Sequence, residues 1–272
     1  MKRYIQFVLA LLWILSSTSA HAELPFTTEE AETLEPGALS VDLGVGYREE
    51  PKDFGVEDRA HQWNLGQARV SLGLGSIVEL QVSGVLAQQI ETLDGDETTN
   101  NGDWVFGTKV WLFQERKKRP AISFLYQVKM PNGANEKGGS TDETDFFGYL
   151  VLSKQIAPGQ VLHANLGIGI LGNPDAMASQ DDIAILRLAW ERQISERTII
   201  GLEGFFQTGP KEKDDPHYLQ VVAAHHLQKW AVYAGLAVGL GDDADQLRAS
   251  IGARYRFSLW SPDRSLVRRN AW

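Results

Sequence analysis

The stretch Ala249–Phe257 reads ASIGARYRF, and it decides the fold class. Apolar or aromatic residues occupy every second position, and Ser250, Gly252, Arg254 and Arg256 lie between them. Successive side chains of a β-strand point to opposite faces, so this strand would have one apolar face and one cationic face. Two structures fit such a pattern: an edge strand of a soluble sheet, or a membrane strand between lipid and a wet lumen.

The same two-residue period recurs along most of the chain. Together with Ala249–Phe257, the alternating segments predict about twelve strands. Clear alternation starts at Leu39, Ala68, Val78, Ile122, Leu162 and Trp230, and weaker alternation lies near 104–114, 145–155, 183–193, 198–208 and 218–227.

The connections between these segments alternate in length along the chain. An up-and-down membrane barrel has short periplasmic turns and longer outer loops, whereas a soluble meander has no reason for such alternation. An even number of strands also leaves both chain ends on the periplasmic side. The long connections lie near 49–66, 91–103, 131–144, 172–182, 209–217 and 241–245, and the short ones near 75–77, 115–120, 156–159, 194–197 and 228–229.

The two faces of the expected strands differ in composition. One face is rich in glycine and carries charges of both signs, unlike an ordinary solvated surface. The apolar positions are too numerous for the core of a soluble sandwich or a lipocalin-like barrel. We therefore predict an all-β protein, a transmembrane antiparallel up-and-down β-barrel. Aromatic residues near the strand ends would form its interfacial girdle, and they are Tyr47, Trp104, Trp190, Trp230, Tyr255 and Phe257.

The N-terminus has the three-part pattern of a signal peptide, with Lys2 and Arg3, an apolar run and a small-x-small site ending at Ala22. The run is shorter than the roughly 20 residues of a spanning helix, although an uncleaved anchor is an alternative. Thr27 and Glu30 have capping-box spacing, which predicts a turn or two of helix. We predict a signal peptide at 1–22, a short N-terminal periplasmic segment at 23–38, an outer-membrane barrel at 39–257 and a C-terminal periplasmic tail at 258–272.

The net charge limits the classes of partner, and the cysteine content excludes disulfides. The formal net charge of −9 becomes −11 once Lys2 and Arg3 leave with the signal peptide. Such an acidic chain is a poor nucleic-acid binder, so the basic run Arg116–Arg119 is interpreted as a solvated turn. The absence of cysteine leaves no disulfides to stabilise the chain.

The histidines give no sign of catalysis. The outer-membrane phospholipase places a His and a Ser two residues apart on one strand, but His163 is followed at that distance by Asn165. Asp214, Asp215 and His217 resemble part of an omptin-like protease site, yet they are more simply a solvated loop. We therefore predict no enzyme.

Two acidic loops contain the sequences DGDE and DDAD, at 94–97 and 242–245. Neither has EF-hand spacing, so no metal site and no cofactor are expected. Loose divalent binding that bridges to lipopolysaccharide phosphates remains an alternative.

Charged side chains on the non-lipid face are the candidate functional residues. A charge facing lipid would cost about 2–4 kcal/mol at mid-membrane, so these residues face the lumen. They either line a passage or pair across the barrel and fill it, and a barrel of about twelve strands allows both. Basic residues outnumber acidic ones in this set, which comprises Arg48, Arg69, Glu79, Lys109, Lys129, Arg187, Glu191, Glu203, Arg248, Arg254 and Arg256.

The run Asn101–Lys109, NGDWVFGTK, resembles the G-D-x-x-x-G-x-K signature of outer-membrane proteins related to the MetA-pathway of phenol degradation. Pro25–Ala31, Val128–Gly133 and His163–Gly167 fit the same family. The resemblance implies an outer-membrane barrel that moves apolar or aromatic small molecules. The chain departs from the family in having Asn132 where Thr is usual, and in continuing past its last strand.

These observations predict a passive channel or transporter for small molecules in the cell outer membrane. The alternative is a sealed structural or adhesive barrel with acidic outer loops and no conductance. The expected partners are outer-membrane lipid and lipopolysaccharide, the barrel-assembly machinery during biogenesis, and a small-molecule solute.

Overall fold

The computed structural model describes residues 26–49, 59–133, 143–172, 182–210, 215–242 and 244–260. The predicted signal peptide and the tail beyond Trp260 lie outside these residues. The described residues contain no helix that is long and apolar enough to cross a membrane. The strands are β1 (Ala38–Glu49), β2 (Arg59–Gly73), β3 (Val78–Thr92), β4 (Glu97–Asn100), β5 (Trp104–Phe113), β6 (Ala121–Met130), β7 (Asp145–Ala157), β8 (Gln160–Ile170), β9 (Asp182–Ser195), β10 (Thr198–Thr208), β11 (His217–Leu227), β12 (Trp230–Gly239) and β13 (Leu247–Ser258).

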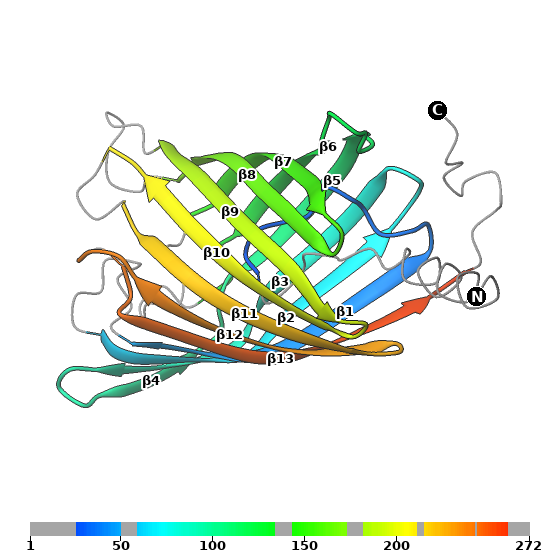
Figure 1. The fold of residues 1–272 in the computed structure, drawn as a ribbon. Coiled ribbons are helices and arrows are strands. Elements are labelled where there is room, and N and C mark those ends of the chain that lie inside the picture. The colour runs from blue at the N-terminus through cyan, green and yellow to red at the C-terminus, as the bar shows by residue number, and fades with distance from the viewer. Residues whose placement is uncertain are drawn as a thin grey trace, which may run out of the picture.

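The strands form one closed antiparallel barrel (Figure 1). β1 pairs with both β2 and β13, which closes the ring and makes Ala249–Phe257 part of the closing strand. β4 and β5 pair with successive parts of β3, so together they occupy one position in the wall. The thirteen strands therefore fill twelve positions, which confirms the predicted twelve-strand barrel.

The connections alternate as predicted. Short turns join the strands at one end of the barrel, hereafter the turn end, and longer connections join them at the other, the loop end. Figure 1 shows the turn end at the right and the loop end at the left. The short turns span 74–77, 114–120, 158–159, 196–197 and 228–229.

Strand β2 begins at Arg59, within the stretch near 49–66 that the alternation predicts to be a connection. The register between β1 and β2 shifts next to Gly66, which has a positive φ of 70° and forms a β-bulge. Gln62 and Asn64 face inward before the bulge, and Arg69 and Ser71 face inward after it. The extra residue reverses the parity, so the alternation cannot be followed across it.

The outer face of the wall is apolar, and the inner face is polar. Leu43, Ile168 and Ile251 are 52%, 63% and 64% exposed, although burying apolar surface is worth about 25 cal/mol per Å². Arg254, which lies between outward-facing neighbours, is only 5% exposed because it faces inward. This division suits a wall with hydrocarbon outside.

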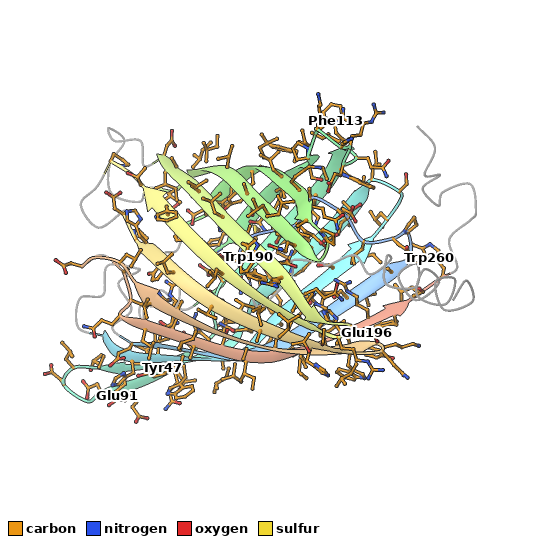
Figure 2. The ribbon with its side chains drawn as sticks, in the orientation of Figure 1. Tyr47, Glu91, Phe113, Trp190, Glu196 and Trp260 are labelled. Carbon is orange, nitrogen blue, oxygen red and sulfur yellow. The ribbon has the colours of Figure 1, made fainter. Side chains whose placement is uncertain are left out.

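Aromatic side chains gather near both ends of the outer face. Tyr47 and Trp63 pack together at the loop end, where their ring centroids lie 4.9 Å apart. Trp230 packs on Tyr255 at the turn end, with centroids 4.6 Å apart. In Figure 2, the labelled side chains of Tyr47 and Trp260 lie at opposite ends of the barrel. Aromatic belts of this kind mark the two interfaces of a membrane.

Candidate functional site

The chain segment before β1 lies inside the barrel. Residues 26–37, hereafter the strap, run along the inner wall and are drawn in blue in Figure 1. Thr28, Glu29 and Ala31 are 1%, 5% and 0% exposed, and their backbone groups bond to inward-facing side chains of the wall. Residues 26–37 of the predicted periplasmic segment 23–38 therefore lie within the barrel.

The helix expected at Thr27–Glu30 is absent, since the strap has no helical residues. Thr27 does not cap a helix: its Oγ1 donates to Glu203 Oε1 at 2.8 Å, and its N–H donates to Oε2 at 3.1 Å. Thr28 donates its N–H and Oγ1–H to the same carboxylate. A single helical turn is costly to nucleate, and the wall supplies acceptors for the N–H groups instead.

The strap then passes along successive strands. Glu29 exchanges two hydrogen bonds with the Asn165 side chain on β8, at 2.7 and 2.9 Å. The Ala31 N–H donates to Ser153 Oγ on β7 at 2.8 Å, and Ser123 on β6 donates to the Ala31 carbonyl oxygen. The Leu34 N–H donates to Glu79 Oε2 on β3 at 2.8 Å. The strap backbone is thus held by side chains from β10 round to β3.

Two glycines in the wall make room for the strap. A Cβ at Gly201 on β10 would lie 2.2 Å from the Phe26 ring. A Cβ at Gly73 on β2 would lie 2.1 Å from the Glu35 carbonyl oxygen. At Gly73 the close atoms belong to the strap backbone, so only glycine admits the strap there; at Gly201 a Cβ would force the Phe26 ring to move.

A buried ionic cluster joins the strap to the opposite side of the lumen. The carboxylate of Glu29 lies 2.5 Å from Arg69 and 3.6 Å from Lys109. Lys109 also lies 3.4 Å from Glu79. Two carboxylates and two cations balance one another, as buried charges require.

The lumen is closed to solvent at the level of the strap. The side chains of Glu79, Lys109, Asn165 and Glu191 are inward-facing, yet each residue is 0% exposed. Residues lining a water-filled passage would be accessible to solvent. A twelve-strand barrel lies between barrels filled by their own side chains and open channels, and here the strap completes the filling.

A second ionic group lies at the loop end. Arg48 contacts Asp245 at 2.7 Å, and Arg248 also donates to this carboxylate. Burial by itself would raise the pKa of Asp245, but the charges and hydrogen bonds of Arg48 and Arg248 outweigh burial and hold that pKa below its ordinary value. At the same end, Lys129 lies 2.5 Å from Asp145 and 3.8 Å from Asp103.

Three residues of neighbouring strands resemble a hydrolase triad. Ser153 Oγ lies 2.8 Å from His163 Nδ1, and His163 Nε2 lies 3.2 Å from Glu191 Oε1. Ser153 and His163 lie opposite each other on β7 and β8, so the pair does not show the spacing of two residues on one strand that the sequence was tested for. The three side chains are buried, and Ser153 Oγ accepts the Ala31 N–H. No substrate carbonyl reaches this serine while the strap is in place, so the group anchors the strap.

The predicted lumen residues therefore fall into several groups. Arg69 and Lys109 contact Glu29, and Lys109 also contacts Glu79. Glu203 bonds directly to the strap, and Glu191 acts on it through His163 and Ser153. Arg48, Lys129 and Arg248 pair near the loop end, and Arg254 lies 2.6 Å from Asp42 on β1. Arg256 lies two residues beyond Arg254 on the same face of β13. Arg187 contacts the strap and aromatic rings.

The residues that sequence reasoning missed are the anchors of the strap. Asn165, Ser153 and Ser123 are short polar residues at inward positions. Alternation places such residues on the inner face of any barrel, so it does not mark these three as anchors. Glu29 lies outside the strands, so the alternation does not indicate where its side chain points. Within the part of the chain that the structure describes, no group of three or more His, Cys, Asp or Glu side chains could hold a metal ion.

Comparison with known proteins supports the fold. A model of the family described as "Putative MetA-pathway of phenol degradation" matches residues 25–265. A search of curated proteins finds no match. The chain is similar in fold to the NanC porin (TM-score 0.57, 12% identity, 79% of this chain and 98% of that chain). It is also similar to the KdgM porin (0.53, 11%, 80% and 99%) and to the translocator domain of autotransporter NalP from Neisseria meningitidis (0.53, 9%, 94% and 95%).

Proposed function

The chain belongs to this MetA-pathway phenol-degradation family, and from that premise we propose that it is an outer-membrane channel or transporter for small molecules, closed at rest by its strap. The turn end faces the periplasm and the loop end faces outward, because the chain enters from the periplasm after loss of a signal peptide. Passage is passive and requires the strap to leave the wall.

The observation that carries this proposal is the chemistry of the contact between strap and wall. Hydrogen bonds and ion pairs to Glu203, Asn165, Ser153 and Glu79 hold the strap, and water can replace each of them. A barrel built only to be sealed could fill its lumen with wall side chains. Filling it with a separate terminal segment leaves a polar passage when that segment departs.

The porin-like fold supports the same proposal. The KdgM porin is described in complex with oligogalacturonate, so a barrel of similar fold contacts an organic solute. The inner wall of this chain is charged, with Arg69, Lys109 and Glu79 on the side facing Glu29. Once the strap leaves, these groups would be hydrated and would suit small polar or ionised molecules.

The proposal is tested by liposome swelling with the refolded mature protein. In one variant, residues 26–34 are replaced by a Gly-Ser sequence of equal length; in the control, the turn residues 116–119 are replaced in the same way. We expect the strap variant to admit small organic solutes at least ten times faster than the wild type and the control. Equal, negligible swelling of all three folded barrels would refute a passage and favour a sealed structural or adhesive barrel.

A further inference from the structure

The inner wall on the loop-end side of the strap is aromatic. Phe147 and Tyr149 on β7 stack with ring centroids 6.4 Å apart, and Phe205 on β10 packs against Tyr218 on β11 with centroids 5.8 Å apart. Gly167 on β8 gives the Tyr149 ring its place, because a Cβ there would lie 2.4 Å from that ring. Phe147 and Phe205 are only half-buried, whereas the residues around Glu29 are fully buried. Solvent therefore reaches this wall.

Arg187 lies on β9 in the midst of this aromatic wall. Its guanidinium carbon lies 4.9 Å from the centroid of the Tyr149 ring and 5.5 Å from that of Phe205. One terminal nitrogen donates to the Thr27 carbonyl oxygen at 2.8 Å, and the other donates to the Tyr149 hydroxyl at 3.2 Å. The Nε–H is buried and has no acceptor among the residues that the structure describes.

The charge of Arg187 is not balanced by a carboxylate in the described part of the chain, where only neutral oxygens and rings contact it. Six other inward-facing cations have carboxylate partners, and they are Arg48, Arg69, Lys109, Lys129, Arg248 and Arg254. A half-buried guanidinium beside aromatic rings favours an anion, because the surrounding low-polarity groups strengthen the attraction.

We propose that Arg187, with Phe147, Tyr149 and Phe205, forms a binding site for a small aromatic carboxylate that enters from the loop end. The carboxylate accepts hydrogen bonds from the guanidinium, and the flat ring packs on the aromatic wall. The site deepens the proposed function by naming a substrate class, and it rests on that function. The ligand also approaches the Thr27 carbonyl, so it meets the strap where the strap begins.

The test is isothermal titration of the refolded mature protein in detergent micelles with benzoate, acetate and benzyl alcohol. We expect benzoate to bind at least ten times more tightly than either of the other two, because only benzoate has both the charge and the ring. Arg187→Gln, which removes the charge and keeps a polar amide, should weaken benzoate binding at least tenfold. Arg192→Gln changes an exposed arginine on the same strand and should leave the affinity unchanged.

A second variant separates the ring from the charge. Phe205→Leu keeps Arg187 and should weaken benzoate several-fold while leaving acetate unchanged. The proposal is overturned if benzoate does not bind, if Arg187→Gln binds it as well as Arg192→Gln does, or if acetate binds as tightly as benzoate. Because titration needs no passage, a barrel that binds benzoate but never admits solute would refute the proposed function alone, and one that admits solute without binding benzoate would refute this site alone.

Discussion

Glu29 is the residue on which the strap most depends, because its carboxylate contacts Arg69 and Lys109 and its backbone bonds to Asn165. Glu29→Gln keeps the shape and removes the charge. Removing one partner of a buried ion pair costs about 3 kcal/mol, so strap opening should increase about 100-fold. Hydrogen exchange of the Glu29 and Ala31 amides measures this opening.

The control for that variant is Glu115→Gln. Glu115 pairs with Lys154 at 2.5 Å, but both side chains are about 30% exposed at the turn end. Such a pair is worth less than about 1 kcal/mol, so exchange in the strap should not change. Equal exchange rates in the two variants would show that the ionic cluster does not hold the strap.

Asp245 makes the loop end sensitive to acid. Its pKa is lowered in the folded protein, so its ionised form stabilises the fold above the ordinary value of 3.8, and this stabilisation is lost as pH falls through the lower folded value. We expect amide protection at 244–246 to be constant from pH 7 to about 5 and to decline below about 4. Asp245→Asn should remove that decline, and a decline that persists in this variant would assign it to another group.

The sequence predicts on which face of the barrel wall a side chain lies, but it does not predict which residue that side chain contacts. Parity placed Arg254 on the inner face because its neighbours Ala253 and Tyr255 belong to the apolar series. Its partner Asp42 is 212 residues away, and the two meet because β1 pairs with β13 in a particular register. Arg187 was placed inward by the same reasoning, but its contact with Thr27 depends on the strap.

The strap approaches the strands of the wall most closely at Gly73 on β2. A Cβ there would lie 2.1 and 2.7 Å from the carbonyl oxygens of Glu35 and Leu34, and backbone atoms have little freedom to retreat. Gly73→Ala should displace this end of the strap and expose it to limited proteolysis, with cleavage mapped within residues 26–37. Gly75→Ala is the matched control, since a Cβ there meets nothing within 4 Å. Equal protection in the two variants would contradict this account of the strap's path.

Two local sequence patterns gave wrong predictions of secondary structure. The bulge at Gly66 reverses the parity of β2, so the alternation predicts a loop for residues 59–66 although they belong to the strand. Thr27 and Glu30 have capping-box spacing, yet their surroundings offer the Glu203 carboxylate in place of a helix. A strap inside a barrel has no periodicity of its own, because the wall decides its conformation.

For the whole molecule, alternation and loop lengths were sufficient to predict the barrel and its approximate strand number. The apolar outer face and the two aromatic belts suit a membrane, and the inner face carries the polar and charged residues. Whether the lumen is open depends on what fills it, and that is a property of the assembled molecule. The charged residues predicted for the lumen are mostly paired there, with one another or with the strap.

We propose that the strap, and not the wall, closes the lumen. Single-channel recording in a planar bilayer compares the wild-type barrel with the variant whose residues 26–34 are replaced by Gly-Ser. We expect rare, brief openings in the wild type and long-lived discrete steps in the variant. An inserted, folded variant that stays as silent as the wild type would contradict this proposal, because the wall alone would then seal the barrel.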